Sequence, residues 1–233
     1  MAFKDGDFLE VEYSAWTAPE NTLISTTDEK MAKDSGLYEE HVKYGPVLVI
    51  IGSSGVIKGL DTALRGMSAG EQKKMTFKPD EAFGERSEGL IRVMPIAEFR
   101  KRDVEPYPGM RVDLDNFTAT VKSVNSGRVV VDANHPYAGR DITYEVKVVK
   151  NLTDEKEKIN ALGKMAGIEV TKVDASGKDV KVSFNNAVKK NADYFMGKAN
   201  LVASIFTYFH NIDKVNVDEE YIRPPELKEQ KKQ

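Results

Sequence analysis

A short segment of this sequence combines glycine-containing turns with apolar residues at helical spacing, and it is the clearest candidate for a binding site. The apolar run at residues 47–51 ends in a Gly-Ser-Ser-Gly turn, which leads to Val56 and Ile57. Leu60 and Leu64 follow four residues apart, on one face of a short helix. If this helix crosses a curved sheet, Val56, Ile57 and Leu60 form the floor of an apolar pocket. The alternative is that these residues are only part of a core.

Other kinds of catalytic site have little support in the sequence. It contains no cysteine, so thiolate nucleophiles and cysteine-bound metals are excluded. Residues 52–55 lack the spacing of a nucleophile elbow, and residues 66–70 are better explained by a helix stop and a turn. His41, His135 and His210 lie far apart without a ligand motif, which favours structural roles for them. We therefore expect neither a metal nor a cofactor.

Length and composition restrict the possible partners. With 233 residues the chain can form one large domain or two ordinary ones. A net charge of -3 gives no argument for nucleic-acid binding. No apolar run approaches membrane-spanning length, so we expect no membrane partner. The first residues lack the apolar core of a signal peptide, which predicts a cytoplasmic location.

Alternating and apolar runs predict strands at 8–16, 23–24, 46–51, 71–78 and 142–149. The last of these should complete the sheet that the first begins. Between them, strands at 90–94, 110–114, 117–124 and 129–132, with a turn at Ser126-Gly127, form a separate small β module. This module is therefore an insertion into the first domain. Gly66 is expected to end the short helix in a left-handed conformation.

Residues 25–43 read as a polar loop that is interrupted by large apolar side chains. Leu37 and Tyr38 lie within it, and Tyr44 follows it. These residues either anchor the loop on the core or form part of a binding rim.

From residue 151 onward the composition shifts to helix formers. Thr153 is the expected N-cap of a helix that ends near Gly167. Segments 168–173 and 180–184 predict a hairpin, and a long helix is expected over 192–211, with Asn191 as its cap. Apolar residues cover more of this last helix than one stripe, which indicates burial on two sides and predicts a homodimer. The polar tail, from about residue 224, is expected to be disordered.

Several segments together resemble one enzyme family. They are residues 11–13, 55–64, 66–67, 70–71 and 79–84, the last two groups carrying Gly-Glu and Pro-Asp-Glu-Ala-Phe-Gly. In this order they resemble the FKBP-type peptidyl-prolyl cis/trans isomerases. The inserted module, through residues 106–111 and 129–139, resembles the insert-in-flap module of SlyD-type members. The C-terminal region resembles the extra domain of the long archaeal members.

This resemblance implies an α+β fold in which a half-barrel antiparallel sheet wraps on a short helix. The implied domains are an FKBP domain at 1–86 and 133–151, an insert-in-flap chaperone domain at 87–132, and an α+β domain at 152–233. The implied pocket residues are Tyr13, Ile24, Ser25, Val47, Val56, Ile57, Leu60, Phe83 and Tyr144. At five of these positions the best-known pattern of the family differs. Phe83 replaces a tyrosine, which removes a hydroxyl that could bond a substrate carbonyl.

The implied activity is isomerisation of X-Pro bonds in unfolded or nascent polypeptides. Rotation about a peptide bond costs ~18–20 kcal/mol, and an apolar cleft can favour the less polar twisted amide. Apolar residues of the insert are expected to capture unfolded segments: Leu90, Ile91, Val93, Met94, Ile96, Phe99 and Met110. Much of this set can equally be the insert's own core. A holdase-type chaperone with little catalysis is the alternative function, and a scaffold protein is a third.

Overall fold

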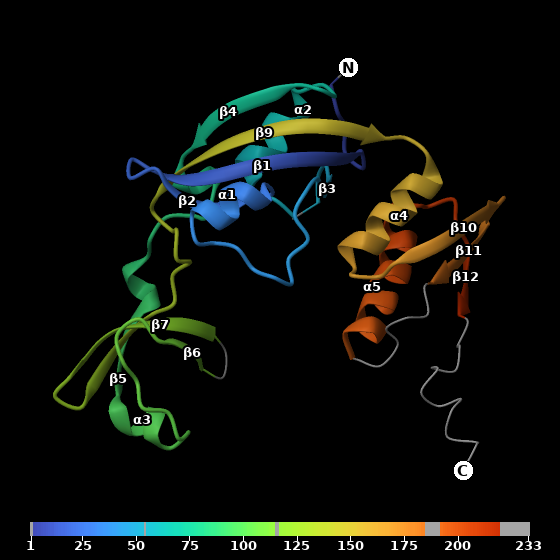
Figure 1. Cartoon of the computed structure of the whole chain (residues 1–233). Helices are drawn as coiled ribbons and strands as arrows, with labels where there is room; N and C mark the ends of the chain where they lie inside the picture. Colours follow the sequence, from blue (N-terminus) through green and yellow to red (C-terminus); the bar gives the residue numbers. More distant parts are fainter. Residues whose placement is uncertain (1, 54, 115–116, 185–191, 220–233) are drawn as a thin grey trace, which may run out of the picture.

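A computed structural model describes residues 2–53, 55–114, 117–184 and 192–219, and it confirms the α+β class. Figure 1 shows a curved sheet with a small β unit below one end and an α+β unit at the other. The strands of the curved sheet are β1 (Phe8–Ala18), β2 (Thr22–Thr26), β3 (Val47–Ile50), β4 (Gln72–Phe77) and β9 (Asp141–Leu152). Their order is β2-β1-β9-β4, with β3 on the free part of β1.

The two central strands of the sheet, β1 and β9, are its first and last strands in the sequence. As predicted, β9 pairs antiparallel with β1, and Ala15 stands opposite Tyr144. Alternate residues of β9 are buried because one face of the strand lies on the core. Helix α2 (Lys58–Arg65) packs on this face through Leu60 and Leu64, which are 1% and 0% exposed. The apolar face of α2 and the buried face of β9 thus pack in one core.

The N-terminal half differs from the sequence prediction in two places, the loop at 25–43 and Gly66, and it decides against one alternative for the apolar residues of that loop. The expected loop contains helix α1 (Glu29–Asp34), whose first turn is capped by Asp28 Oδ1 accepting from Met31 N at 2.8 Å. Leu37 and Tyr38 are 40% and 41% exposed, so they do not anchor the loop in the core. Gly66 ends α2 with a φ of -86°, because the turn that follows needs no left-handed residue.

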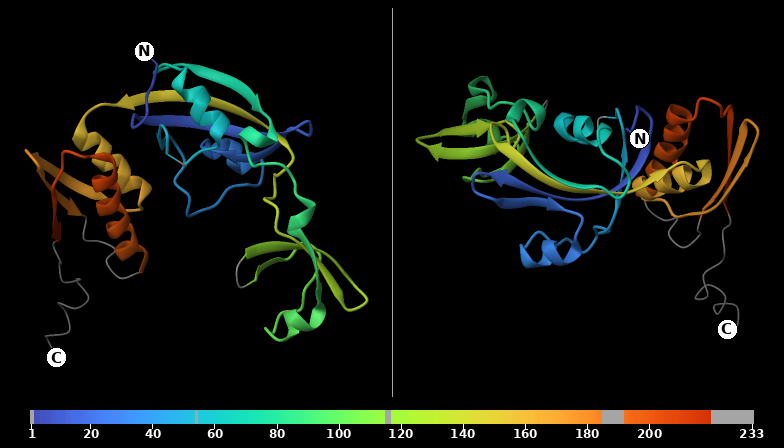
Figure 2. Two further views of the ribbon diagram at one scale, coloured as in Figure 1. Left: turned by 180° about the vertical axis from the view of Figure 1, so that it is seen from behind. Right: turned by 90° about the horizontal axis from the view of Figure 1, so that it is seen from above.

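The inserted unit has a sheet and a core of its own (Figure 2). Its strands, in the order β5-β8-β7-β6, are β5 (Ile91–Pro95), β6 (Arg111–Leu114), β7 (Phe117–Asn125) and β8 (Arg128–Asp132). Helix α3 (Ile96–Arg100) places Phe99 in the core beside Val121 and Val131. The 3-10 turns η1 (Pro79–Glu81) and η2 (Glu88–Leu90) precede the unit.

The C-terminal unit contains α4 (Glu155–Met165), β10 (Val170–Ser176), β11 (Asp179–Phe184), α5 (Ala192–Tyr208) and β12 (Lys214–Glu219). Asp154, not Thr153, caps α4, since its Oδ1 accepts from Glu157 N at 3.0 Å. The predicted hairpin is present as β10 and β11. Strand β12 was not predicted; it pairs parallel with β11. The predicted cap Asn191 and the tail from 224 lie outside the described residues, as does Ser54.

Strand β3 separates two hydrophobic cores. Val47 and Val49 pack in the core of the curved sheet with α2, whereas Leu48 and Ile50 pack in the core of the C-terminal unit. Phe8 of β1 also belongs to this second core, where its ring contacts Tyr208 edge-on at 5.6 Å between centroids. The C-terminal unit is therefore fixed to the outside of the sheet by buried apolar contacts.

Among the helices of the described residues, none has the length and apolar character of a membrane span.

Candidate active site

A cleft of about 700 Å³ opens between β3, the start of α2 and the segment that carries Phe83. Seven of the nine predicted pocket residues line it: Tyr13, Val47, Val56, Ile57, Leu60, Phe83 and Tyr144. Leu60 is almost fully buried and lies in the core below, while Val56 and Ile57 are half-buried. These three residues come together because Ile57 directly precedes the helix and Leu60 lies in its first turn.

The other two predicted residues do not line the cleft. Ser25 Oγ lies 3.1 Å from Tyr13 Oη, so this serine positions the tyrosine ring. Ile24 packs against the core of the curved sheet. Both come from β2, which pairs with the far end of β1.

Aromatic rings support the closed end of the cleft. Tyr144 lies between Tyr13 and Phe77, with ring centroids at 5.6 and 6.2 Å. Burial, together with the neighbouring Tyr13, raises the pKa of Tyr144 to about 12. Its hydroxyl therefore stays protonated at neutral pH and remains a hydrogen-bond donor.

Phe83, which lines the cleft, belongs to a stack of rings that the sequence did not reveal. The Phe83 ring stacks on His135 at 4.2 Å with an interplanar angle of 9°, and Tyr137 lies 5.7 Å from both rings. Burial and the positive charge of Arg111 lower the pKa of His135. His135 Nδ1 accepts from Tyr137 N at 3.3 Å, which suits the neutral ring. His135 thus supports the Phe83 ring. Within the described ranges, no group of three or more His, Asp or Glu side chains could hold a metal ion.

The two chain segments that connect the insert to the curved sheet are joined by a buried carboxylate. Asp132 is 3% exposed and pairs with Arg86, while its Oδ1 accepts from Asn134 N and Nδ2 at 3.0 and 2.7 Å. Burial opposes ionisation of Asp132, but the bonds from Asn134 and Arg86 outweigh it and lower its pKa. Asn134 also exchanges two hydrogen bonds with the Ser87 backbone, at 2.8 and 2.9 Å. These contacts fix the neck of the insert beside the cleft.

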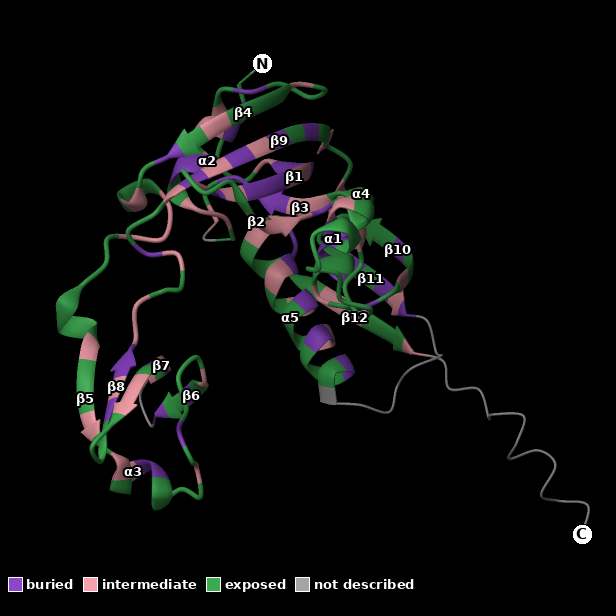
Figure 3. Ribbon diagram, turned by 60° about the vertical axis from the view of Figure 1, so that its left-hand side comes forward, coloured by how far each residue is buried: buried purple, intermediate pink, exposed green. Residues whose placement is uncertain are grey.

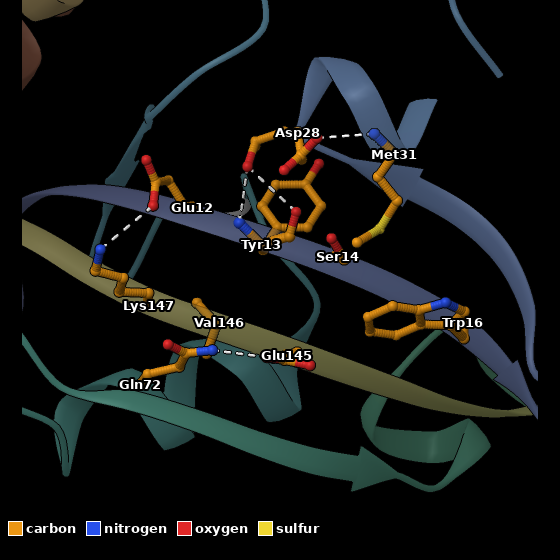
Figure 4. A pocket seen from close by; sticks show the side chains of 11 residues that line it. Glu12, Tyr13, Ser14, Trp16, Asp28, Met31, Gln72, Glu145, Val146 and Lys147 are labelled. Atoms are coloured by element: carbon orange, nitrogen blue, oxygen red, sulfur yellow. Dashed lines mark hydrogen bonds and ion pairs between the residues drawn. The ribbon is translucent and has the colours of Figure 1, made fainter. Parts of the chain in front are cut away.

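A second hollow, of about 360 Å³, lies on the outer face of the sheet beside α1 (Figure 4). Its polar side chains largely pair with one another. Gln72 Nε2 donates to Glu145 Oε1 at 2.6 Å, and Lys147 Nζ lies 3.7 Å from Glu12 Oε2. The apolar cleft on the inner face is therefore the better candidate for a site.

Comparison with known proteins assigns the family. Residues 1–100 match the family model for FKBP-type peptidyl-prolyl cis-trans isomerase, and residues 92–137 match the one described as FKBP26, IF domain. A short-type peptidyl-prolyl cis-trans isomerase of Methanocaldococcus jannaschii is 32% identical over 145 residues, which are 62% of this chain and 91% of that protein. The chain belongs to the FKBP-type peptidyl-prolyl cis-trans isomerases.

Further relatives of this isomerase are named SlyD. The FKBP-type isomerases SlyD of Pasteurella multocida and Vibrio cholerae are 30% and 31% identical over 133 residues. Each alignment covers 55% of this chain and 66% of the relative. The two matching family models end at residues 100 and 137, before the C-terminal unit begins.

The structure separates the predicted client-binding residues of the isomerase's insert. Leu90 and Val93 are 41% and 61% exposed. Met94, Ile96 and Met110 pack partly against the insert's core, and Ile91 is half-buried. Phe99 is 2% exposed and its ring fills the insert's core, which is the alternative that the sequence left open for this set. Tyr107, 62% exposed, is an apolar surface residue that the prediction omitted.

Proposed function

We propose that this isomerase binds the X-Pro bonds of unfolded or partly folded proteins in the apolar cleft and accelerates their rotation. The observation that carries the proposal is the cleft itself, with Leu60 as its floor and Tyr13, Phe83 and Tyr144 around it. Uncatalysed X-Pro isomerisation takes tens to hundreds of seconds and can limit folding. Unfolded chains are therefore the substrates that gain most.

The chemistry requires no nucleophile and no proton transfer. The planar amide is polar through resonance, and the twisted amide has lost that resonance. An apolar, water-poor wall favours the twisted form over the planar ground state. The hydroxyls of Tyr13 and Tyr144 can donate to substrate carbonyls and so hold the segment in place. Lowering the barrier by about 4 kcal/mol accelerates isomerisation roughly a thousandfold.

The insert supplies the proposed chaperone activity. We assign residues 87–132 to an insert-in-flap domain between the two parts of an FKBP domain at 1–86 and 133–151, with residues 152–233 as a third domain of the long archaeal type. Figure 3 shows β5 at the outer edge of the insert's sheet. Leu90, Val93 and Tyr107 each expose an apolar side chain on this unit, and these side chains are the proposed contacts for apolar segments of clients. In this arrangement the insert captures extended apolar segments and delivers prolines to the cleft.

The test is the cis-to-trans rate of a proline tetrapeptide with the wild type and with a Tyr13→Ala/Phe83→Ala double variant. We expect the double variant to lose about a hundredfold in kcat/KM, because two walls of the cleft are removed. Tyr38→Ala, an exposed loop residue outside the cleft lining, should keep wild-type catalysis. A wild type that suppresses client aggregation but does not catalyse would favour the holdase function.

We also propose that a second copy of the chain covers the exposed face of α5 and β12. Leu201 and Ile205 of α5 are fully buried, but Phe195, Met196, Phe206 and Val217 are 54%, 62%, 44% and 39% exposed. A hollow of about 520 Å³, lined by Phe195, Val202 and Val217 among others, lies between the helix and the strand. A symmetric dimer is the commonest way to bury such a face.

Light scattering at micromolar concentration should show a dimer, and Phe195→Glu should convert it to a monomer. Val93→Glu places the same charge on an exposed apolar position of the insert and should leave the dimer intact. A monomeric wild type would contradict the proposal.

A further inference from the structure

We propose that the C-terminal unit forms one wall of the proline cleft and that Met165 determines which residues are accepted next to the proline. Met165 is the last residue of α4, and it lines the cleft together with Leu48 and Val56. It lies outside the two segments that match the family models. This inference rests on the proposed function of the cleft and specifies its substrate preference.

The wall is held in place by the core that β3 shares with α4. Leu48 and Ile50 of β3 belong to the same cluster as Ile159 and Leu162 of α4. Ile159 and Leu162 are 0% exposed, and Leu162 lies one turn before Met165 on the helix. Since Val47 and Val49 of the same strand face the cleft and its core, the strand connects the two units directly. Movement of α4 against the cleft would break this buried contact.

Two glycines that lie close to neighbouring elements, Gly163 and Gly197, further restrict the end of α4. A Cβ added at Gly163 would lie 2.5 Å from Val170 Cγ2, so the last turn of the helix packs tightly on β10. A Cβ added at Gly197 would lie 2.4 Å from the carbonyl oxygen of Ala166, the C-cap of α4. The backbone of Met165 is therefore held between β10 and α5.

The Met165 side chain, in contrast, is available to a ligand. It is 56% exposed although it stands at the rim of an apolar cleft. A thioether on three rotatable bonds adapts to apolar surfaces of different shape and contacts aromatic rings favourably. A peptide with its proline on Leu60 extends toward the rim in both directions, so a residue beside the proline meets this side chain. Met165 thus favours large apolar residues next to proline.

The experiment replaces the Met165 side chain by a charged one and measures which peptides the enzyme then prefers. kcat/KM is measured at low salt for two peptide sets, in which the residue before or after proline is Leu, Lys or Glu. Met165→Glu should raise the Lys-to-Glu ratio of kcat/KM in at least one set by about fivefold, and Met165→Lys should lower it by a similar factor. Both variants should also weaken the wild-type preference for Leu.

The matched control is Val42→Glu, which places the same charge at an exposed apolar residue (47%) outside both the cleft lining and the proposed dimer face. It should leave every ratio unchanged. Opposite ratio shifts cannot arise from a general loss of structure, because that would lower all peptides together. Ratios within twofold of the wild type for both charged variants would overturn the assignment of Met165. A wild type without catalysis on any peptide would instead contradict the proposed function.

Discussion

Replacing residues 88–131 by a two-glycine linker is expected to slow the catalysed refolding of a proline-limited protein about a hundredfold, while tetrapeptide turnover changes less than about threefold. The insert raises the effective concentration of an unfolded segment near the cleft, and a tetrapeptide is too short to use that second contact. The structure indicates where to cut, because Arg86, Asp132, Ser87 and Asn134 form the neck contacts and all remain in this variant. The cleft should therefore keep its rim.

The measurement compares both substrates in one preparation of each protein. In the intact chain, Val93→Ser and Leu90→Ser test the exposed apolar residues without deletion, and each should reduce only the refolding activity. Phe99→Ser would be uninformative because Phe99 belongs to the insert's core. An equal loss on the two substrates after deletion would show that the insert supports the cleft instead of capturing clients.

Gly59→Ala is expected to destabilise the protein by about 2–3 kcal/mol through overpacking, although alanine is the better helix former. A Cβ at this position would lie 2.4 Å from Phe77 Cδ1 and 2.9 Å from Cγ. Phe77 is 7% exposed, and its ring also supports Tyr144, so neither group can move freely. Helix α2 must then shift and carry Leu60 with it. Because the cleft depends on the position of its floor, kcat/KM should fall about tenfold.

Gly66→Ala, at the C-cap of the same helix, is the matched control. Its φ of -86° suits any residue, and an added Cβ would lie 3.6 Å from the Ala63 carbonyl oxygen, an ordinary contact. This variant should be neutral or slightly more stable, since alanine restricts the unfolded chain. Thermal unfolding and tetrapeptide kinetics measure both effects. Full stability and activity of Gly59→Ala would show that the close approach to Phe77 is not required.

Elements with local sequence signals could be predicted from the order of the residues alone. Alternation at period two located β1 and β9, and helical spacing located α2 together with the apolar residues at its start. The residues that line the cleft could be named because they lie in short segments that resemble a known family. Asp154 was missed as a cap by one residue, since Thr153 and Asp154 are both good caps and only the geometry of the first turn separates them.

Contacts between groups far apart in the sequence became known only from the folded chain. The pairing of β12 with β11 could not be predicted, because the two strands are parallel and paired residues such as Asp179 and Lys214 lie 35 positions apart. Apolar type alone did not separate Phe99, inside the insert, from Val93, on its surface. The stack of Phe83 on His135, the carboxylate of Asp132 at the neck and the position of Met165 at the cleft all join segments far apart in the chain. Such contacts leave no local pattern, because periodicity and capping report only on neighbours within a few residues, whereas packing selects partners by shape and burial.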